Sequence, residues 1–242
     1  MISIVIPIRN LDYPNAHYTG NCIGNIKYHT KLSYEIIIVD NASTVDLSSA
    51  TENLQQAVDK YYRFDTNQGV AKAWNKGIEL ANGEYICIMN SDVEVYENWD
   101  ESMIDSLNKV NVVMATPMYA YPYGRADRAN KLRLEVGNDI FSDFMDFSCF
   151  MFKRKLIDEI GLFDENMEIG WGEDVDFRFR CEEKGNIIKS NRLVNTHHIG
   201  MATGFSMMNH GEKVNEAMDK NREYIKNKWK LDANGVPEFK RL

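Results

Sequence analysis

Apolar runs of strand length recur along the first half of the chain, with helix-like segments between them. The runs are rich in β-branched residues and show little polar alternation, which is typical of strands covered on both faces in a parallel sheet. They occupy residues 2–8, 34–40, 61–65 and 84–90. The alternation of strand and helix predicts βαβ units, and therefore an α/β, Rossmann-like fold with helices flanking a mostly parallel sheet.

Residues 20–29 and 70–81 repeat apolar side chains at steps of three and four, which predicts two amphipathic helices. The segment from residue 212 onward has the same spacing and predicts a closing helix packed on the flank of the sheet. Its apolar positions are Val214, Met218, Ile225 and Trp229.

The second half of the chain is less regular. The phenylalanines of residues 147–154, Phe147, Phe150 and Phe152, are expected in the core. A helix is expected to start near Glu173 and to stop at Gly185. Its buried side chains are predicted to be Val175, Phe179 and Cys181.

Composition limits the classes of function. A chain of 242 residues with 44% hydrophobic residues is long enough for one large core, so we expect a single domain. The net charge of −8 disfavours broad binding to nucleic acid or to a membrane surface. The 4 cysteines lie far apart, which predicts reduced thiols rather than a metal knuckle. We find no apolar stretch near the ~18 residues of a membrane span, and we expect a cytoplasmic protein, with peripheral membrane attachment left open.

Polar side chains follow the ends of the predicted parallel strands. Ligands of open α/β sheets bind beyond the carboxyl ends of the strands. Residues 7–10, 40–43 and 90–94 should therefore gather at one edge of the sheet.

Six segments recur here in a familiar order along the chain: SIVIPIRN, YEIIIVDNAST, NQGVAKAWNKG, NGEYICIMNSDVEV, IGLFDEN followed by WGEDVDFRFRCEEKG, and HHIGMATG. Together they resemble the GT-A glycosyltransferases of family 2, and among them the rhamnosyltransferase-like members. The resemblance implies an inverting transfer of a sugar from a nucleotide-diphosphate donor, usually with a divalent metal. It also implies a division of the single domain, 1–242, into a nucleotide-sugar half (1–95), an acceptor and catalytic half (96–204) and a helical tail (205–242).

The resemblance implies a donor site formed by residues that follow the first strands. These are Pro7, Arg9, Asn10, Asp40, Asn41, Asn67, Gly69, Lys72, Asn90, Ser91 and Asp92. Asp40 is placed to accept hydrogen bonds from ribose hydroxyls or a ring N–H, although a simple Asx turn is the alternative. Asn67 stands before a helix whose N-terminus can face the nucleotide, but it also fits a plain N-cap.

An oxygen-rich segment ends the fourth strand. If the extended path continues, Asn90, Asp92 and Glu94 lie on one side, where hard oxygen ligands suit Mg²⁺ or Mn²⁺. The family pattern is Asp-x-Asp, whereas this chain has Asn90-Ser91-Asp92, so the first carboxylate is missing. Asp92 is the best single ligand and the role of Glu94 stays open. A plain turn that begins at Asn90 is the alternative.

A histidine would complete such a metal site. Neighbouring residues of a strand point to opposite faces, so at most one of His197 and His198 is a ligand. The similarity of the HHIGMATG segment to the family favours His198, followed by Thr203. Imidazole suits manganese better than magnesium, so His198 would favour Mn²⁺.

Inversion requires a base for the acceptor hydroxyl, and the resemblance implies that Asp174 is this base. Glu173, Asp174 and Asp176 crowd the start of a helix, where mutual repulsion can raise one pKa. Favourable interaction with the helix dipole is the alternative explanation for Glu173 and Asp176. Trp171 is expected to contact the acceptor sugar, with Glu173 beside it, although Trp171 could equally be core.

Two other classes remain open at this stage. A nucleotidyltransferase would share the fold and the metal, but it ordinarily needs a glycine-rich loop after the first strand, which is absent from residues 7–17. A nucleotide- or carbohydrate-binding module without turnover would explain the missing aspartate of the metal motif.

The acceptor is the least defined partner. A hydroxyl of a glycan or glycolipid is expected, and the sequence does not indicate an oligomeric state. Residues 117–133 mix turn formers, tyrosines and basic side chains and predict a long excursion. Its basic residues could contact a phosphorylated acceptor, the donor diphosphate or a modified nucleic acid, or could be solvated. They are Arg125, Arg128, Lys131 and Arg133.

Overall fold

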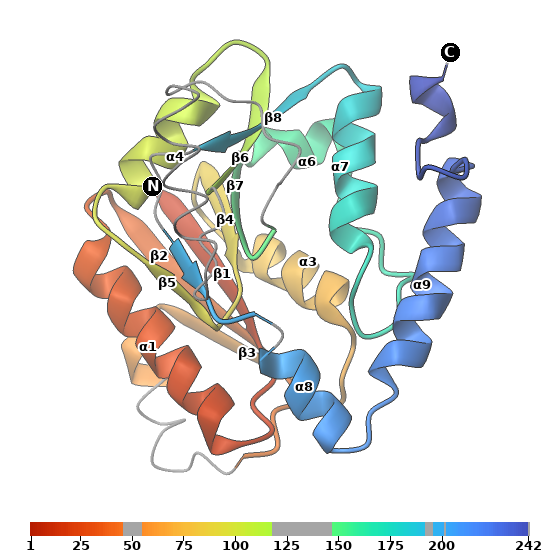
Figure 1. Ribbon diagram of the computed structural model, residues 1–242. Helices are drawn as coiled ribbons and strands as arrows, with labels where there is room; N and C mark the ends of the chain where they lie inside the picture. Colours follow the sequence, from red (N-terminus) through yellow and green to blue (C-terminus); the bar gives the residue numbers. More distant parts are fainter. Residues whose placement is uncertain (46–54, 118–146, 192–195, 201, 242) are drawn as a thin grey trace, which may run out of the picture.

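The computed structural model describes residues 1–45, 55–117, 147–191, 196–200 and 202–241 (Figure 1). The strands are β1 (Ile2–Ile8), β2 (Tyr34–Asn41), β3 (Lys60–Phe64), β4 (Tyr85–Met89), β5 (Val93–Val95), β6 (Val112–Pro117), β7 (Cys149–Lys153), β8 (Ile187–Asn191) and β9 (Thr196–His198). The α-helices are α1 (Tyr13–His29), α3 (Val70–Leu80), α4 (Trp99–Leu107), α6 (Lys155–Ile160), α7 (Glu173–Glu183), α8 (Ala202–Asn209) and α9 (Val214–Trp229). A short 3-10 helix, η1 (Glu238–Lys240), follows them.

Within the described residues, seven strands form one mixed sheet in the order β3-β2-β1-β4-β7-β6-β8. β1 runs parallel to both of its neighbours, β2 and β4, and β3 is parallel to β2. β7 is antiparallel to β4 and β6, and β8 runs parallel to β6. A second, two-stranded sheet pairs β5 with β9. The predicted α/β architecture with a mostly parallel sheet is confirmed.

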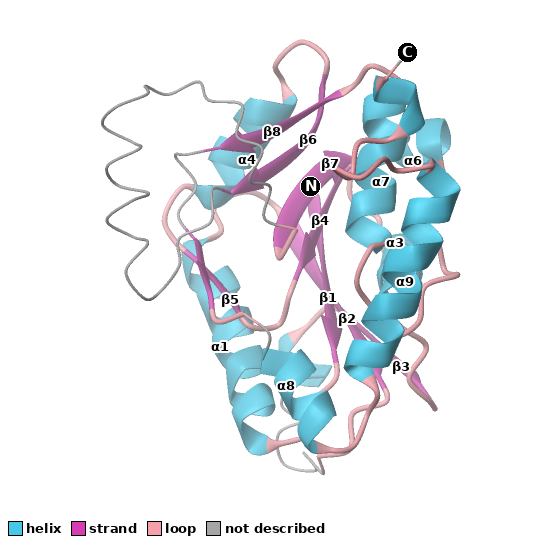
Figure 2. Ribbon diagram, turned by 45° about the vertical axis from the view of Figure 1, so that its right-hand side comes forward, coloured by secondary structure: helices cyan, strands magenta, loops and turns pink. Residues whose placement is uncertain are grey.

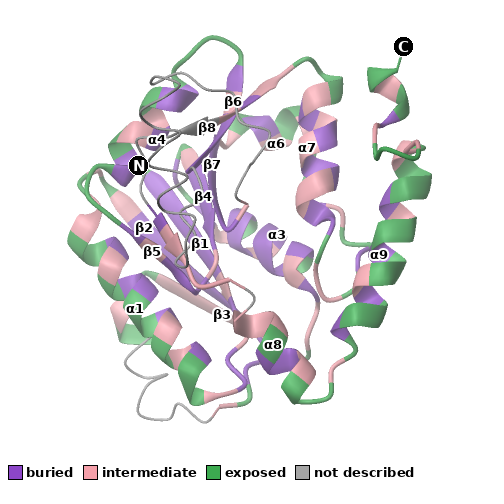
Figure 3. Cartoon of the chain, in the orientation of Figure 1, coloured by how far each residue is buried: buried purple, intermediate pink, exposed green. Residues whose placement is uncertain are grey.

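The period of two along the central strand divides the core between the two faces of the sheet. Ile2, Ile4 and Ile6 of β1 pack in a cluster with residues of α1 and α4. Val5 of β1 points to the opposite face and packs in a cluster with residues of α3, α6 and α7. Figure 2 shows these two helical layers on either side of the sheet, and Figure 3 shows the central strands β1, β2, β4 and β7 between them as mostly buried. Both faces are therefore covered, as the unbroken apolar runs predicted.

The chain reverses its direction of travel across the sheet at β1. β2 and β3 lie on one side of β1 and β4 lies on the other, so the strand order switches between β1 and β4. The carboxyl ends of these parallel strands meet at one edge, which is where α/β folds bind ligands.

The first helix is longer than predicted, because it begins at Tyr13 rather than near residue 20. Asp12 accepts a hydrogen bond from the Asn15 backbone N–H (3.0 Å) and caps the helix. Pro14 lies in the first turn, where a missing N–H costs nothing. The proline and the polar residues before residue 20 did not indicate a helix in the sequence, although they form a capped helix start.

The predictions about packing are confirmed in part. In α7, Val175 is only partly buried, and sequence analysis missed the fully buried Phe177. Phe150 and Phe152 are core residues as predicted, and Phe147 is partly buried, packs against Phe150 and also lines a cavity. α9 packs its apolar side on α7 and the loop before it, through Ile225 and its neighbours, rather than on the flank of the sheet.

The four cysteines are free and buried, in agreement with the expected thiols. Among the described residues, no helix has both the length and the apolar character that crossing a bilayer requires. The basic residues at 125–133 lie outside the described residues, as does most of the predicted excursion.

Candidate active site

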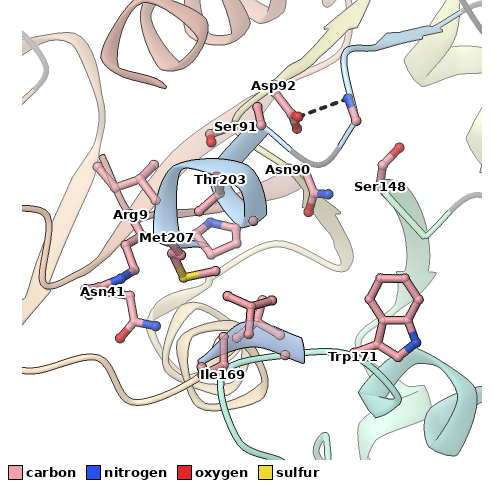
Figure 4. A pocket seen from close by; sticks show the side chains of 18 of the residues that line it. Arg9, Asn41, Asn90, Ser91, Asp92, Ser148, Ile169, Trp171, Thr203 and Met207 are labelled. Carbon is pink, nitrogen blue, oxygen red and sulfur yellow. Dashed lines mark hydrogen bonds between the residues drawn. The ribbon is translucent and has the colours of Figure 1, made fainter. Parts of the chain in front are cut away.

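A cavity of about 730 Å³ opens at the carboxyl edge of β1, β2 and β4, a size that suits a small-molecule site (Figure 4). It brings together residues that are far apart in the chain. The predicted site residues that line it are Pro7, Arg9, Asn41, Asn67, Asn90, Ser91, Asp92, Trp171, Glu173, Asp174 and His198.

Four residues of the predicted donor site do not line this cavity: Asn10, Asp40, Gly69 and Lys72. Asp40 is fully buried, and its carboxylate accepts hydrogen bonds from the Ser43 backbone N–H (2.8 Å), the Tyr61 hydroxyl (2.6 Å) and the Arg63 guanidinium. The structure therefore shows the Asx-turn contact, which was the alternative, and leaves no Asp40 oxygen facing the cavity. Burial, together with Asp40, raises the pKa of Tyr61 to about 12.

The other three residues make hydrogen bonds to neighbouring residues of the protein. Asn10 is buried, and its side chain accepts a hydrogen bond from Thr19 (3.1 Å). Gly69 has φ of +82° at the start of α3 and presents its carbonyl to Asn41. Lys72 is exposed and donates to Gln68 (3.0 Å).

Arg9 forms one wall of the cavity and joins three segments. Its guanidinium donates to the carbonyls of Asn41 and Ala42 (both 2.8 Å) and forms an ion pair with Glu212. Asn67 donates to the other Glu212 oxygen (3.2 Å) and accepts from Asn41 (2.9 Å). The N-cap of α3 is Gly69, so Asn67 is not the plain cap that sequence analysis allowed. Glu212 was not identified from the sequence, because it lies 145 residues from Asn67 and no local pattern relates them.

The fourth strand does not continue in an extended path, contrary to the prediction. The backbone turns at Ser91 and Asp92, with Val93 N–H donating to the Asn90 carbonyl (3.3 Å). This turn separates Asp92 from Glu94, which sits on β5 and faces His197 (3.4 Å). The predicted convergence of Asn90, Asp92 and Glu94 is therefore wrong, and Glu94 is absent from the cavity lining.

Asp92 meets His198 across the small β5-β9 sheet. One carboxylate oxygen of Asp92 lies 3.2 Å from His198 Nε2, and the other accepts from the Gly200 N–H (3.2 Å; dashed in Figure 4). Adjacent strand residues point to opposite sides, so His197 and His198 have different partners, as expected. The pairing of Val93 with His198 is what carries the imidazole to the cavity.

A divalent ion fits this pair. Two neighbouring ligands of an octahedral ion, each at about 2.1 Å, lie about 3 Å apart, close to the separation of the Asp92 oxygen and His198 Nε2. In the described part of the chain, no cluster of three or more His, Cys, Asp or Glu side chains is arranged for a metal. Protein atoms at this position would thus supply a carboxylate and an imidazole, and a bound ligand would supply the rest.

The start of α7 places two carboxyl groups in the lining of the same cavity. Glu173 is buried, and its Oε2 has no hydrogen-bond partner among the described residues. Burial, and then the adjacent charge of Asp174, raises the pKa of Glu173 to about 8. Burial also raises the pKa of Asp174, which is partly offset by backbone N–H groups at the helix start. A carboxylate with a raised pKa at a cavity wall can accept a proton.

Trp171 stands next to these acids with 46% of its surface exposed. Its ring has the Arg222 guanidinium at 5.8 Å, and Figure 4 shows it at the rim of the cavity. The open side is an apolar surface of the kind that carbohydrate rings contact. The structure thus excludes the alternative that Trp171 is core.

The C-terminal tail contributes a wall that sequence analysis did not assign to the site. Phe205 and Met207 of α8, and Val214 and Met218 of α9, line the cavity. Val214 and Met218 were predicted only to pack the closing helix on the sheet, and the return of the tail over the sheet edge brings them to the cavity. Thr203, which sequence analysis named together with His198, also lines it.

Comparison with known proteins places this geometry in a family. The model of the family described as Glycosyl transferase family 2 matches residues 3–161. A Streptococcus pneumoniae serotype 4 protein, glycosyltransferase GlyG, is 31% identical over 129 residues, which is 52% of this chain and 41% of that protein. The chain therefore spans less than half the length of this relative.

Two solved structures share the architecture. The crystal structure of GalNAc-T7 with UDP, GalNAc and Mn²⁺ superposes with a TM-score of 0.67 at 17% identity, covering 82% of this chain and 43% of that one. The mannosyltransferase PcManGT from Pyrobaculum calidifontis, in complex with GDP-Man and Mn²⁺, gives a TM-score of 0.62 at 18% identity, covering 78% and 54%. At these identities the likeness shows a common fold.

Proposed function

This chain belongs to glycosyl transferase family 2 and has the GT-A fold, and from that premise we propose that it is an inverting, metal-assisted glycosyltransferase. The donor is a nucleotide-diphosphate sugar, and the acceptor is a hydroxyl group of a glycan or glycolipid. The observation that carries the proposal is one cavity in which Asp92 and His198 lie on one wall and Asp174 lies on another.

The donor would occupy the side of the cavity formed by the ends of β1, β2 and β4. Arg9, Asn41 and Asn67 provide polar atoms there for the nucleoside. Asp92 and His198 would hold Mn²⁺ or Mg²⁺, which would neutralise charge on the diphosphate as it departs. The named structural neighbours contain UDP or GDP-mannose with Mn²⁺, which supports this arrangement.

Asp174 would act as the general base. The acceptor oxygen attacks the anomeric carbon from the face opposite the diphosphate, and a new C–O bond forms with inversion. The bond to the diphosphate breaks and its electron pair goes to the phosphate oxygen, while the hydroxyl proton passes to Asp174. The raised pKa of Asp174 favours its acceptance of that proton.

The acceptor would approach past Trp171, with Glu173 beside it. Trp171 offers an exposed ring to a sugar face, and Phe205 is a second exposed aromatic side chain in the cavity lining. An open aromatic rim suits a carbohydrate acceptor better than a small ion or a buried cofactor.

A transfer assay tests this function. The wild-type chain is first screened by thermal shift against UDP, GDP and dTDP sugars with and without Mn²⁺, and the sugar that stabilises it is then used as donor. Asp174→Asn should keep donor binding and lower turnover by about 10²–10⁴, the usual contribution of a general base. Asp92→Ala should remove the Mn²⁺-dependent part of donor binding.

Lys72→Ala is the matched control, because Lys72 is exposed and lies outside the cavity lining. Donor binding without sugar transfer or donor hydrolysis in the wild type would instead indicate a binding module. Full turnover in Asp174→Asn would exclude this residue as the base.

A further inference from the structure

The loop before α7 has an unusual backbone. Ile169 has φ of +57° and Trp171 has φ of +88°, followed by Gly172 at +107°. Residues other than glycine rarely adopt this left-handed conformation, and β-branched residues such as Ile169 adopt it least often. Such a conformation persists only where the surrounding structure holds it. The loop also lies in residues 162–242, outside the segment that the family model matches. The contacts that hold it must therefore be found in this structure.

Asn221 of α9 provides that support. It is buried (2% exposed) and faces the loop with its whole amide group. Its Oδ1 accepts from the Glu168 N–H (3.0 Å), and its Nδ2 donates to the carbonyls of Glu168 and Gly170 (both 2.9 Å). Three hydrogen bonds to two backbone residues flanking Ile169 leave the loop little freedom to relax.

The far side of the same loop is held by α3. The Val70 N–H, at the start of that helix, donates to the Ile169 carbonyl (2.7 Å). A side chain on Gly69 would meet the Met167 carbonyl oxygen at 3.4 Å, which shows how closely the two backbones approach. The loop is thus clamped between α9 and α3, with Asn221 as the buried polar member.

The clamped loop leads directly to the proposed acceptor and base residues. Ile169 and Trp171 line the cavity, and α7 begins with Glu173 and Asp174 immediately after Gly172. Asn221 itself does not line the cavity. Any influence of Asn221 on transfer must therefore pass through the loop.

We propose that Asn221 is a positioning residue for acceptor use: its three hydrogen bonds hold residues 168–172 so that Trp171 and Asp174 meet the acceptor in register. The inference rests on the proposed function, since it assigns these residues to the acceptor and to proton transfer. Donor binding, which uses residues at the ends of β1, β2 and β4, is expected to be independent of Asn221.

The chain offers a matched control in Asn75 of α3. Asn75 is also buried and holds a backbone residue in the same way, accepting from the Phe163 N–H (2.9 Å) and donating to the Phe163 carbonyl (2.9 Å) and to Glu165 (2.8 Å). Phe163 does not line the cavity. Asn75→Ala therefore removes a comparable clamp from a segment outside the site.

The test compares Asn221→Ala and Asn75→Ala with the wild type, at a temperature where all are folded. Asn221→Ala should lower kcat/KM for the acceptor at least about tenfold and leave the donor dissociation constant within about twofold. Asn75→Ala should lower the melting temperature to a similar extent and change neither constant by more than about twofold. Asn221→Asp keeps the volume and the Glu168 contact but loses both donor hydrogen bonds, so it should behave like Asn221→Ala and serves if alanine prevents folding.

Hydrogen exchange of the Val70 and Glu168 amides provides a second readout that needs no activity. Both should exchange faster in Asn221→Ala than in Asn75→Ala, because only the first variant releases the loop. Unchanged exchange, or an equal loss of acceptor kcat/KM in both alanine variants, would overturn the inference. If the wild type transfers no sugar, the proposed function fails, and the exchange rates still decide whether Asn221 holds the loop.

Discussion

At the scale of single residues, the cavity is lined by two adjacent carboxyl groups that occupy different surroundings. Glu173 is buried with an unpartnered oxygen, whereas Asp174 is partly buried and accepts from the Val175 N–H (2.8 Å). Burial, and then the charge of Asp174, raises the pKa of Glu173 from its ordinary value of 4.5 to about 8. Glu173 therefore keeps its proton at neutral pH. A neutral Glu173 would leave Asp174 as the more readily ionised member of the pair, which is the state that a base requires.

This difference predicts a pH-dependent stability for Glu173→Gln. Between pH 4.5 and about 8 the folded state keeps a proton that the unfolded state has lost, so the free energy of unfolding of the wild type falls as pH rises through that window. Glutamine does not titrate, so the variant should gain stability relative to the wild type over the same range. Denaturant unfolding at several pH values measures the difference in the free energy of unfolding between the variant and the wild type, which we call the stability gap.

Glu183→Gln on the same helix is the control, because Glu183 is exposed and its gap to the wild type should stay nearly constant. A constant gap for Glu173→Gln as well would mean that Glu173 is ionised in the folded protein at neutral pH.

At the scale of elements, the site is positioned by the close packing of α3 on β1. Gly77 of α3 lies so near the strand that an added Cβ would be 2.0 Å from Val5 Cγ1. Because Gly77 has no side chain, α3 can pack closely on β1. The start of α3 then lies at the cavity, where Val70 is part of the lining.

Gly77→Ala should therefore destabilise the protein. Overpacking costs about 1–3 kcal/mol, which outweighs the gain of up to about 1 kcal/mol in helix propensity. Gly24→Ala in α1 is the matched control, because nothing lies within 4 Å of its added Cβ and it should stabilise the protein by up to about 1 kcal/mol. Equal stability changes in the two variants, measured by denaturant unfolding, would mean that α3 can move away from β1 without loss.

At the scale of the whole molecule, the C-terminal helix is joined to the rest of the domain by an ionic network centred on the buried Asp176. Asp176 of α7 is fully buried and accepts from Arg180 (2.9 Å), Lys228 (2.7 Å) and Trp229 (2.9 Å). Lys228 also donates to Asp164 (2.6 Å), where the contact helps to hold the pKa of that carboxyl well below its usual range despite the opposing effect of burial. The tail is thus an integral part of the domain.

Lys228→Met should lower the free energy of unfolding by about 1–3 kcal/mol, because a buried carboxylate loses a charged hydrogen-bond partner while Arg180 and Trp229 remain. Lys226→Met changes an exposed lysine of the same helix and should stay within about 0.5 kcal/mol of the wild type. Thermal or denaturant unfolding compares the two. An equal decrease in the free energy of unfolding of both variants would mean that the contacts of Lys228 with Asp176 and Asp164 do not stabilise the fold.

Local patterns in the sequence were enough to predict much of the N-terminal part of the chain, residues 1–95. Unbroken apolar runs predicted β1, β2 and β4, and the rule that ligands bind at carboxyl ends placed Arg9, Asn41 and Asp92 at one edge before any coordinates. These features depend on residues near in sequence, which is why period and composition reveal them. The capped start of α1 and the turn at Ser91 were misjudged, because polar residues there fit several backbone paths.

The sequence alone therefore determined the fold class, the edge of the sheet at which the cavity lies and most of the polar side chains that line the cavity. Tertiary structure alone decided that Asp40 faces Tyr61 and Arg63, that Glu212 reaches Arg9, and that Asn221 holds the loop before α7. Each of these contacts joins polar groups of residues that are distant along the chain. Their pairing depends on how helices and strands pack in three dimensions, and no periodicity along the sequence encodes it.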